Sequence, residues 1–369
     1  MRTNFKVNHK FRKFLFLSGF MALVTFLSPA TILAQDPNGS ATGTINDIDT
    51  SLVKVIDTVS KAKDTSFAAM NSTVAKLSAA VATIGNADGH NKIAINIVWT
   101  LITGFLVMFM QAGFALVETG FTQKKNVAHT MAMNFMIYIL GLLGFWICGF
   151  AFMFGGGLNV AALGGAAGVT SHEVTWHIFG HDFGIIGSVG YFLSSDVYDV
   201  GIFALFLFQM VFMDTTATIP TGSMAERWKF KAFMVYGFFI SMFVYPIYGN
   251  WVWGGGWLAQ LGVNFHLGHG HVDFAGSTVV HMVGGVAALA GAIVIGPRLG
   301  KYGKDGKVNT IPAHNIPMAL LGTFILAFGW FGFNPGSTLA GTDLRISVIA
   351  VNTMLASASG TLMAALYVW

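Results

Sequence analysis

The chain has 369 residues, of which 54% are hydrophobic and only 10% charged, and its formal net charge is +4 at pH 7. Soluble domains carry about 25% charged residues, so this composition excludes an ordinary soluble protein. A single cysteine excludes a disulfide framework. The sequence contains no nucleophile–base arrangement, phosphate-binding glycine loop or nucleotide motif. We therefore expect no enzyme, no cofactor and no nucleic-acid partner.

Residues 1–34 have the order of a secretory signal peptide. Basic residues precede the apolar run "FLFLSGFMALVTFLSPATILA", and Ala34 stands before the polar stretch "QDPNGS". This order predicts cleavage after Ala34, with an uncleaved signal anchor as the alternative. Both alternatives place residue 35 onward outside the cytoplasm.

Residues 35–90 form a separate polar segment before the first long apolar run. Apolar residues recur there at three- and four-residue steps, which predicts amphipathic helix, and "DTSFAAMNST" (64–73) interrupts the pattern as a predicted turn. We expect an extracytoplasmic helical cap on the membrane part. A ligand-binding domain is the alternative.

Seven later segments are apolar and long enough to cross about 30 Å of hydrocarbon. Lipid offers no partner to free backbone groups, so these segments should be helices. Gly276, Gly284 and Gly285 favour close contact between helices. The prediction is an all-α polytopic membrane protein with spans at 93–117, 127–154, 200–225, 232–253, 274–296, 318–334 and 346–369.

The charged loops predict the orientation of the spans. Lys and Arg residues occur in the connections that follow the first, third and fifth segments, whereas connections 155–199 and 254–272 contain none. Positively charged loops mark the cytoplasmic side. The mature N-terminus is therefore expected outside, in a multi-pass protein of the cell (inner) membrane.

The stretch "DFAGSTVVH" places Asp273 and His281 in an otherwise apolar run. On an α-helix, eight residues span about 12 Å and rotate by roughly 80°, so the two side chains would share one broad face. Ionisable groups at membrane depth usually line a path or cavity. We therefore expect this segment to line a conduit.

Aromatic residues and a hydroxyl fall at the same predicted depth as Asp273. Aromatic faces attract cations, and a serine hydroxyl can accept a hydrogen bond from an N–H cation. His281 would suit a neutral or proton-exchanging solute. The pattern predicts a small, monovalent, protic cation, bound near Phe212, Trp253 and Ser337.

Several segments resemble the signatures of the ammonium transporter (Amt) family, in the same order. They are "QAGFALVETGFTQKKN", "FQMVF", "NWVWGGGW", "DFAGSTVVH" and "GWFGFNPGS", and the resemblance covers residues 91–369. It implies an inverted-repeat helix bundle of eleven helices, of which seven are present. The expected domains are thus 1–34, 35–90 and the C-terminally incomplete membrane domain 91–369.

The resemblance also implies roles for individual residues. Phe212, Trp253 and Ser337 would recruit the cation, and Asp273 would support that site electrostatically, without touching the solute. Phe212 and Phe333 would form the pore gate. His281 would be the first of two pore histidines; the second has no counterpart here, so we expect a piece of a longer protein.

The implied activity is membrane transport of ammonium, for nitrogen uptake. The cation would lose its proton near the Phe gate and cross as ammonia along a hydrophobic pore. The alternative is the ammonium-sensing module of a receptor. Implied partners are ammonium or its analogue methylammonium, the lipid bilayer, two further copies in a homotrimer and a PII-type regulatory protein.

Three residues of the third segment are possible accessories to the site: Phe208, Gln209 and Asp214. A carboxylate at the depth of Asp214 should face protein or water. It is either a second pore carboxylate or a group bonded to neighbouring threonines, Thr215, Thr216 or Thr218.

Histidines gather in the two long connections that lack basic residues. Two histidines four residues apart, as in "HIFGH", can share a metal on a helix. No other ligand spacing accompanies them, so we expect histidine-rich loops and no metal site, with a metal site as the alternative. The residues concerned are His172, His177, His181, His266, His269 and His271.

Overall fold

The computed structural model describes residues 67–155, 161–163, 173–194, 197 and 199–369. The chain divides into two compact units, 1–84 and 85–369. The predicted signal peptide and most of the 35–90 segment lie outside the described residues. The turn predicted at 64–73 is wrong from Phe67 onward, where the chain is helical. No glycine or proline interrupts that stretch, so its alanines and methionine continue the helix.

Seven helical stretches of the described chain are long and apolar enough to cross a membrane, which confirms the predicted all-α polytopic class. They match the seven predicted segments, with differences of a few residues at most ends. The fourth is longer than predicted because a further helix follows Trp253. Their bounds are Asp88–Phe121, Lys124–Phe154, Val200–Ser223, Phe230–Phe265, Ser277–Ile295, Ile316–Thr338 and Ile346–Val368.

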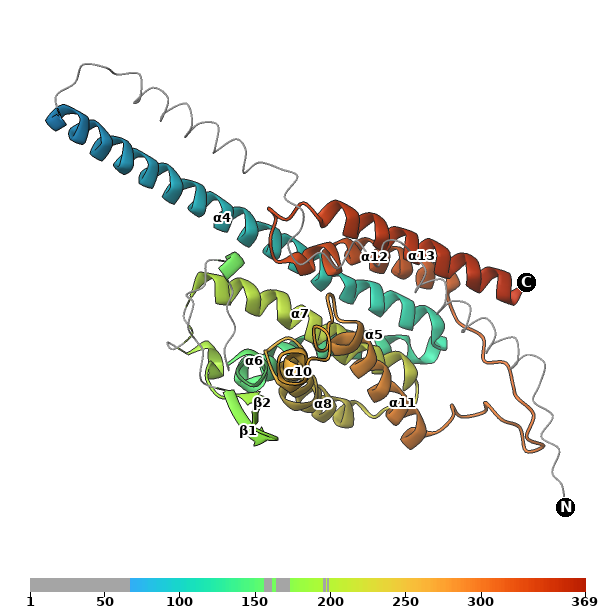
Figure 1. Ribbon diagram of the computed structural model, residues 1–369. Helices are drawn as coiled ribbons and strands as arrows, with labels where there is room; N and C mark the ends of the chain where they lie inside the picture. Colours follow the sequence, from blue (N-terminus) through green and yellow to red (C-terminus); the bar gives the residue numbers. More distant parts are fainter. Residues whose placement is uncertain (1–66, 156–160, 164–172, 195–196, 198) are drawn as a thin grey trace. The chain divides into compact units, whose positions relative to one another are not determined.

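The spans are built from the helices labelled in Figure 1. The bounds are α4 (Phe67–Phe121), α5 (Val127–Gly144), α6 (Phe150–Phe154), α7 (Val200–Ser223), α8 (Phe230–Phe239), α9 (Tyr245–Val252), α10 (Trp257–Phe265), α11 (Val283–Ile295), α12 (Ile316–Phe333) and α13 (Ile346–Val368). Wide π-helical turns interrupt three spans, at η2 (Phe145–Gly149), η6 (Ile240–Val244) and η7 (Ser277–Met282). A short 3-10 turn, η8 (Pro335–Thr338), follows α12.

Helix α7 provides most of the core of the 85–369 unit. Asp199 caps its first turn by accepting hydrogen bonds from the backbone N–H of Gly201 at 2.8 Å and of Ile202 at 3.2 Å. The helix packs against α5 and α11, and Figure 1 shows these three together. Phe208 and Phe212 of α7 are each only 1% exposed. Side chains on α7 therefore lie where several spans meet.

Glycines permit the closest helix contacts. A Cβ on Gly322 of α12 would lie 2.6 Å from the backbone oxygen of Gly113 on α4, so no larger residue fits without movement. The close approach predicted at Gly284 is present, since a Cβ there would lie 2.6 Å from Ile219 Cδ1. Gly285 has no neighbouring atom within 4 Å. Its expected role in packing is therefore absent within the described structure.

Part of the connection 155–199 forms an antiparallel hairpin of β1 (Glu173–Ile178) and β2 (His181–Gly187). Its inward side is anchored by Phe183, which is 7% exposed and stacks on Phe265 of α10 at 5.6 Å. This hairpin was not predicted from the sequence, which favoured a loop over the connection. The hairpin covers the end of α9, with which β2 is in contact.

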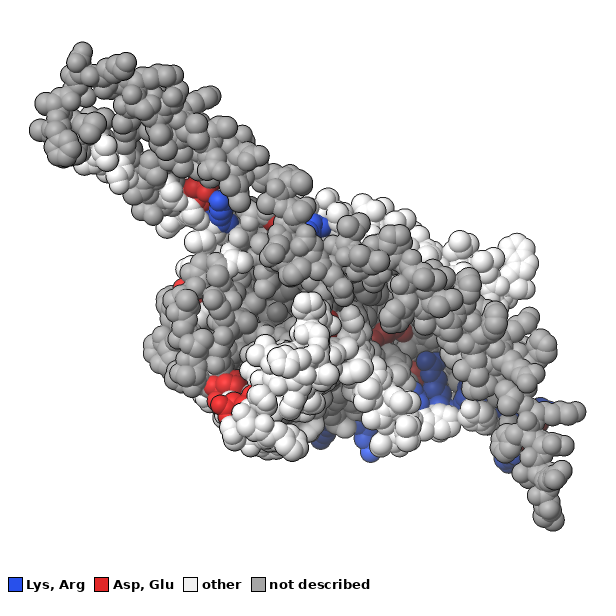
Figure 2. All heavy atoms as spheres, in the orientation of Figure 1, with Lys and Arg blue, Asp and Glu red and all other residues white. Residues whose placement is uncertain are grey.

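The basic loops meet at one end of the 85–369 unit. Arg298 approaches Glu226 at 3.5 Å, and the backbone N–H of His314 donates to the oxygen of Thr122 at 3.2 Å. In Figure 2 the described surface is mainly white, and the largest group of blue spheres lies near the end of α11. This grouping agrees with the alternation of the loops. Which end faces the cytoplasm stays a prediction.

Candidate functional site

Three aromatic rings from three different spans meet beside the end of α9. The ring of Phe212 stacks on Phe333 of α12, with centroids 4.0 Å apart and planes 25° apart. The Trp253 ring meets Phe212 edge-on at 6.1 Å. Phe333 is fully buried, whereas Trp253 is partly exposed. We call Phe212, Trp253 and Phe333 the aromatic cluster; the structure brings these predicted residues together.

Ser337 is tied to the same cluster through the backbone. It lies in η8, directly after α12, and its hydroxyl donates to the backbone oxygen of Phe333 at 2.8 Å. A hydroxyl has one hydrogen and two lone pairs. Because the hydrogen is used internally, the Ser337 oxygen is left as an acceptor. An acceptor beside aromatic rings suits a cation that carries N–H groups.

Asp273 caps the first turn of the fifth span. Its Oδ1 accepts hydrogen bonds from the N–H of Gly276 and Ser277, at 2.7 and 2.8 Å. Its Oδ2 accepts from the N–H groups of Thr278 and Val279 and from the Thr278 hydroxyl, at 2.7–2.8 Å. Five donors thus surround one carboxylate that is 8% exposed. Asp273 is fixed by the protein itself and offers little surface to a solute.

The expectation that Asp273 and His281 share one face of an α-helix is wrong. The helix begins at Ser277, and Gly276 before it has a left-handed φ of 92°. The first turn is π-helical, because the N–H of His281 donates to the oxygen of Gly276 at 2.9 Å, five residues back. Asp273 lies ahead of the helix, so the α-helical spacing does not apply.

Trp253 and Asp273 are nevertheless joined directly. The indole Nε1 of Trp253 donates to the backbone oxygen of Asp273 at 2.6 Å. The side chain of Asp273 thus accepts the hydrogen bonds of the turn at 276–279, and its backbone oxygen accepts the hydrogen bond of the Trp253 indole. The capped turn therefore sets the position of the ring that closes one side of the aromatic cluster.

His281 lies on the other side of Phe333. The two rings are nearly parallel, with centroids 5.4 Å apart and planes 21° apart. Trp330, one helical turn before Phe333, also stacks on the imidazole of His281. The centroids of these two rings are 5.8 Å apart and their planes differ by 28°. Trp253, Phe212, Phe333 and His281 therefore form one continuous row of rings.

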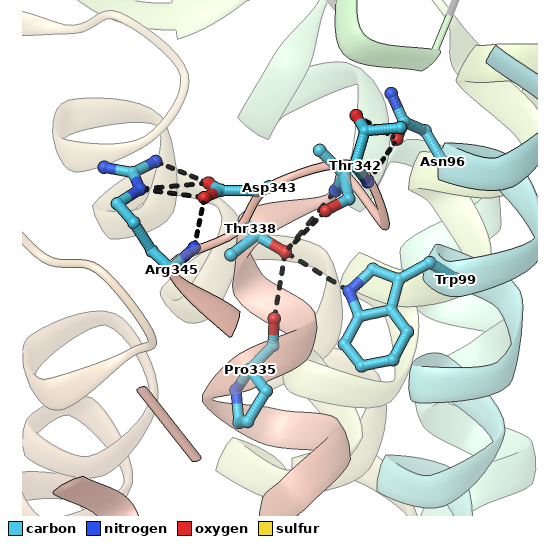
Figure 3. A network of polar contacts seen from close by, with 8 residues as sticks. Asn96, Trp99, Pro335, Thr338, Thr342, Asp343 and Arg345 are labelled. Carbon is cyan, nitrogen blue, oxygen red and sulfur yellow. Dashed lines mark hydrogen bonds and ion pairs between the residues drawn. The ribbon is translucent and has the colours of Figure 1, made fainter. Parts of the chain in front are cut away.

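A polar network supports the turn that carries Ser337, and Figure 3 shows it from close by. The indole of Trp99 on α4 donates to the hydroxyl of Thr338 at 3.2 Å, and that hydroxyl donates to the oxygen of Pro335 at 2.9 Å. Asn96 Oδ1 accepts from the N–H and hydroxyl of Thr342, at 3.2 and 3.0 Å. These contacts fix η8 against α4.

The possible accessory residues lie at different places. Phe208 packs against Phe212 with ring centroids 4.6 Å apart and planes tilted by 34°, and so extends the aromatic cluster. Gln209 is 7% exposed, and its Oε1 has no hydrogen-bond partner among the described residues. Their roles in solute binding stay predictions.

Asp214 faces away from the aromatic cluster. It is 2% exposed, and its Oδ1 lies 3.8 Å from where a Cβ on Gly141 of α5 would be. The neighbouring threonines donate elsewhere: Thr215 and Thr216 to backbone oxygens of α7, and Thr218 to Gln111. Neither alternative from the sequence describes this arrangement, because the carboxylate packs against α5.

Two of the described histidines in the long connections each have a polar partner of their own. His177 Nδ1 lies 2.9 Å from Asp182 Oδ1 on the exposed hairpin, and His271 Nε2 lies 2.9 Å from the hydroxyl oxygen of Thr278. Among the described residues, no group of three His, Cys, Asp or Glu could hold a metal ion. His172 lies outside that part of the chain.

Sequence reasoning missed Trp330 as a partner of His281, and Thr278, Trp99 and Thr338 as supports. Trp330 could have been found, since it precedes Phe333 by three residues and so shares its helix face. The others make contacts through turns and between distant spans, for which the sequence carries no periodic signal.

The comparisons with known proteins agree with this geometry. The Ammonium Transporter Family matches residues 98–369, most of the chain. The chain belongs to the ammonium transporter family. Its members are transporters and not enzymes, which agrees with the lack of catalytic motifs in the sequence, and the helix bundle is that of this family.

Two curated relatives illustrate the similarity. The chain is 48% identical to ammonium transporter Amt2 of Archaeoglobus fulgidus, over 75% of this chain and 55% of the relative. It is 41% identical to a putative ammonium transporter of Synechocystis sp., over 75% and 57%. The chain thus spans about half the length of the curated relatives it matches.

Solved structures show the same fold. A protein described as a sensor Amt protein matches with a TM-score of 0.64 and 37% identity, over 76% of this chain and 63% of that one. Mep2 of Candida albicans matches with a TM-score of 0.57 and 29% identity, over 73% and 53%. The family membership and the fold class predicted from the sequence are confirmed.

Proposed function

We propose that the protein transports ammonium across the inner membrane, recruiting the cation at the aromatic cluster and passing it toward His281. The observation that carries this proposal is the continuous row of rings from Trp253 through Phe212 and Phe333 to His281. Ammonium transport is what the names of the relatives state for those proteins.

Recruitment rests on the chemistry of the partly exposed end of this row. The ring face of an aromatic residue attracts a cation by about 0.5–2 kcal/mol, depending on desolvation. Ser337 supplies an acceptor oxygen for an N–H group. An ammonium ion can satisfy both, whereas potassium has no hydrogen to donate. This combination favours ammonium and methylammonium over alkali cations.

The buried part of the row favours a neutral solute. Phe212 and Phe333 are 1% and 0% exposed, so a solute that passes them leaves water behind. Charge is costly in such surroundings. The cation therefore gives its proton to water on the partly exposed side of this pair and continues as ammonia beside His281. Asp273 contributes through its fixed negative charge and through Trp253, without contacting the solute.

An ammonium-sensing function is the second candidate, because a sensor Amt protein is among the structural matches. Recruitment at the aromatic cluster would be common to both functions. They differ in flux, which a transporter supports and a pure sensor does not. A homotrimer, regulation by a PII-type protein and an extracytoplasmic N-terminus belong to the same proposal by analogy with the family.

The first test is binding of ammonium to the purified chain, measured by calorimetry in detergent against potassium as the control ion. We expect heat of binding for ammonium and methylammonium and none for potassium. Equal binding of ammonium and potassium would contradict recruitment at this site. Flux is then measured in liposomes that contain the whole protein encoded by the gene; absent flux with intact binding would favour the sensor.

A further inference from the structure

One histidine of the loop before the fifth span occupies a defined place beside the Asp273 turn. The backbone N–H of His271 donates to the oxygen of Leu258 on α10 at 3.0 Å. Its ring Nε2 lies 2.9 Å from the hydroxyl oxygen of Thr278, and the residue is half-buried. His266 and His269 of the same loop are exposed. His271 is thus held at both its backbone and its ring.

The direction of the hydrogen bonds in this chain can be assigned. The carboxylate of Asp273 accepts five hydrogen bonds, and an ionised carboxylate can only accept. The single hydrogen of the Thr278 hydroxyl therefore points to Asp273 Oδ2, at 2.7 Å. The hydroxyl oxygen is left as an acceptor toward His271. The imidazole must carry its hydrogen on Nε2 and donate it.

The same chain reaches the aromatic cluster. His271 donates to Thr278, Thr278 donates to Asp273, and the backbone oxygen of Asp273 accepts from Trp253 Nε1 at 2.6 Å. Linked hydrogen bonds in a low-dielectric site polarise one another, so losing one member weakens the others. The loop therefore has a physical connection to the ring that lines the partly exposed end of the site.

We propose that His271 is a positioning residue of the ammonium site. It acts through Thr278 and Asp273 to fix the indole of Trp253, and it does not touch the solute. This proposal rests on the proposed function, since it assumes that Trp253 contributes to ammonium binding. It assigns to one histidine of the loop a hydrogen-bond donor role rather than a metal.

The test is the dissociation constant of ammonium for the purified chain, with matched variants of two loop histidines. His271→Ala removes the donor, and we expect binding to weaken about fivefold, the effect of one net hydrogen bond. His271→Gln places an amide N–H donor near the position of Nε2 and should restore the affinity. His269→Ala, two residues earlier and exposed, should leave it unchanged.

Rescue by glutamine would show that a side chain of similar reach with an N–H donor restores the affinity that alanine loses. The second control is the Thr278→Val background, which removes the acceptor of the His271 bond. There, His271→Ala should have no further effect on affinity, as expected for two residues that act through one contact. An equal loss in both backgrounds would overturn the proposal, and so would His271→Ala binding as tightly as wild type.

Failure of this inference can be told apart from failure of the proposed function by Trp253→Leu. If that variant weakens ammonium binding while His271→Ala does not, recruitment at the aromatic cluster stands and the positioning role falls. If the wild-type chain does not discriminate ammonium from potassium, the proposed function falls first.

Discussion

The rings of Phe212 and Phe333 stack at a centroid distance of 4.0 Å and join α7 to α12. Both side chains are buried, and Trp253 and His281 lie on opposite sides of the pair. A solute that travels along this row must displace at least one of the two rings. In the proposed transport function, this pair separates the side where the cation is recruited from the side that leads to His281.

Replacing Trp253 by leucine should weaken ammonium binding by about 1 kcal/mol, because the cation loses an aromatic face. The change also removes the hydrogen bond to Asp273. Trp253→Phe keeps an aromatic face but lacks the indole N–H. Its affinity for ammonium should therefore lie between those of the wild type and the leucine variant. Calorimetry with the purified chain measures the three affinities, and an unchanged affinity in the leucine variant would assign Trp253 to the membrane interface.

Asp273→Ala should destabilise the protein, because four backbone N–H groups lose their acceptor. Asp273→Asn should also be harmful, since its NH₂ group would face donors at whichever oxygen it replaces. Each unsatisfied buried group costs about 1–3 kcal/mol. Thermal unfolding in detergent measures both variants, with Asp182→Asn on the exposed hairpin as the control. An alanine variant as stable as wild type would show that the cap is not needed, and an equally stable asparagine variant would show that one acceptor oxygen is enough.

Glu173 makes the hairpin sensitive to pH. Burial raises the pKa of its carboxyl from 4.5 to about 7. A hydrogen bond from Asn250 Nδ2 at 3.2 Å favours the charged form and lowers the pKa, but its effect is smaller than that of burial. The folded state therefore holds the proton more tightly than the unfolded state. This contribution to the free energy of unfolding is complete below 4.5 and is lost as the pH rises through about 7.

Glu173→Gln should remove this pH dependence and leave the hairpin more stable than wild type above neutral pH. Hydrogen exchange of the β2 amides, compared between about pH 5 and pH 8 after correction for intrinsic rates, measures the effect. A wild-type hairpin that becomes more protected at higher pH would contradict the predicted sign.

Gly322→Ala should destabilise the contact between α4 and α12 by about 1–3 kcal/mol, because the new methyl group meets backbone atoms that cannot move independently. The nearest are the oxygen of Gly113 at 2.6 Å and the nitrogen of Val117 at 2.7 Å. Gly285→Ala is the matched control, since no atom lies within 4 Å of its new methyl group. Equal unfolding midpoints for the two variants would show that the helices separate without cost.

The spans could be predicted from the sequence because length and apolarity alone decide them. The aromatic cluster could be expected from convergence at one depth, although the contacts of Phe212 with Phe333 required the packed structure. The apolar spans and the aromatic residues at one depth could both be identified from the residue types along 93–369. The fold class and the family followed from them.

The parts that sequence reasoning missed depend on backbone turns. Asp273 caps a turn that contains a left-handed glycine, so helical spacing gave the wrong relation to His281. The position of Asp214 depends on which helix packs against its side of α7. The hairpin that begins at Glu173 pairs residues across a tight connection, and its alternation is interrupted by a bulge. Such features have no fixed period along the chain.

Because of the π-helical turn at η7, the number of residues between Asp273 and His281 determines how α11 is rotated relative to the Asp273 turn. Such a turn contains one more residue than an α-helical turn would need. The capped turn fixes one end of this stretch, and the packing of Gly284 against Ile219 fixes the other. Deleting a single residue between them would rotate one end against the other by about 100°. Among natural variants of this protein, substitutions of the exposed Ser277 should therefore be tolerated where insertions and deletions within 277–280 are not.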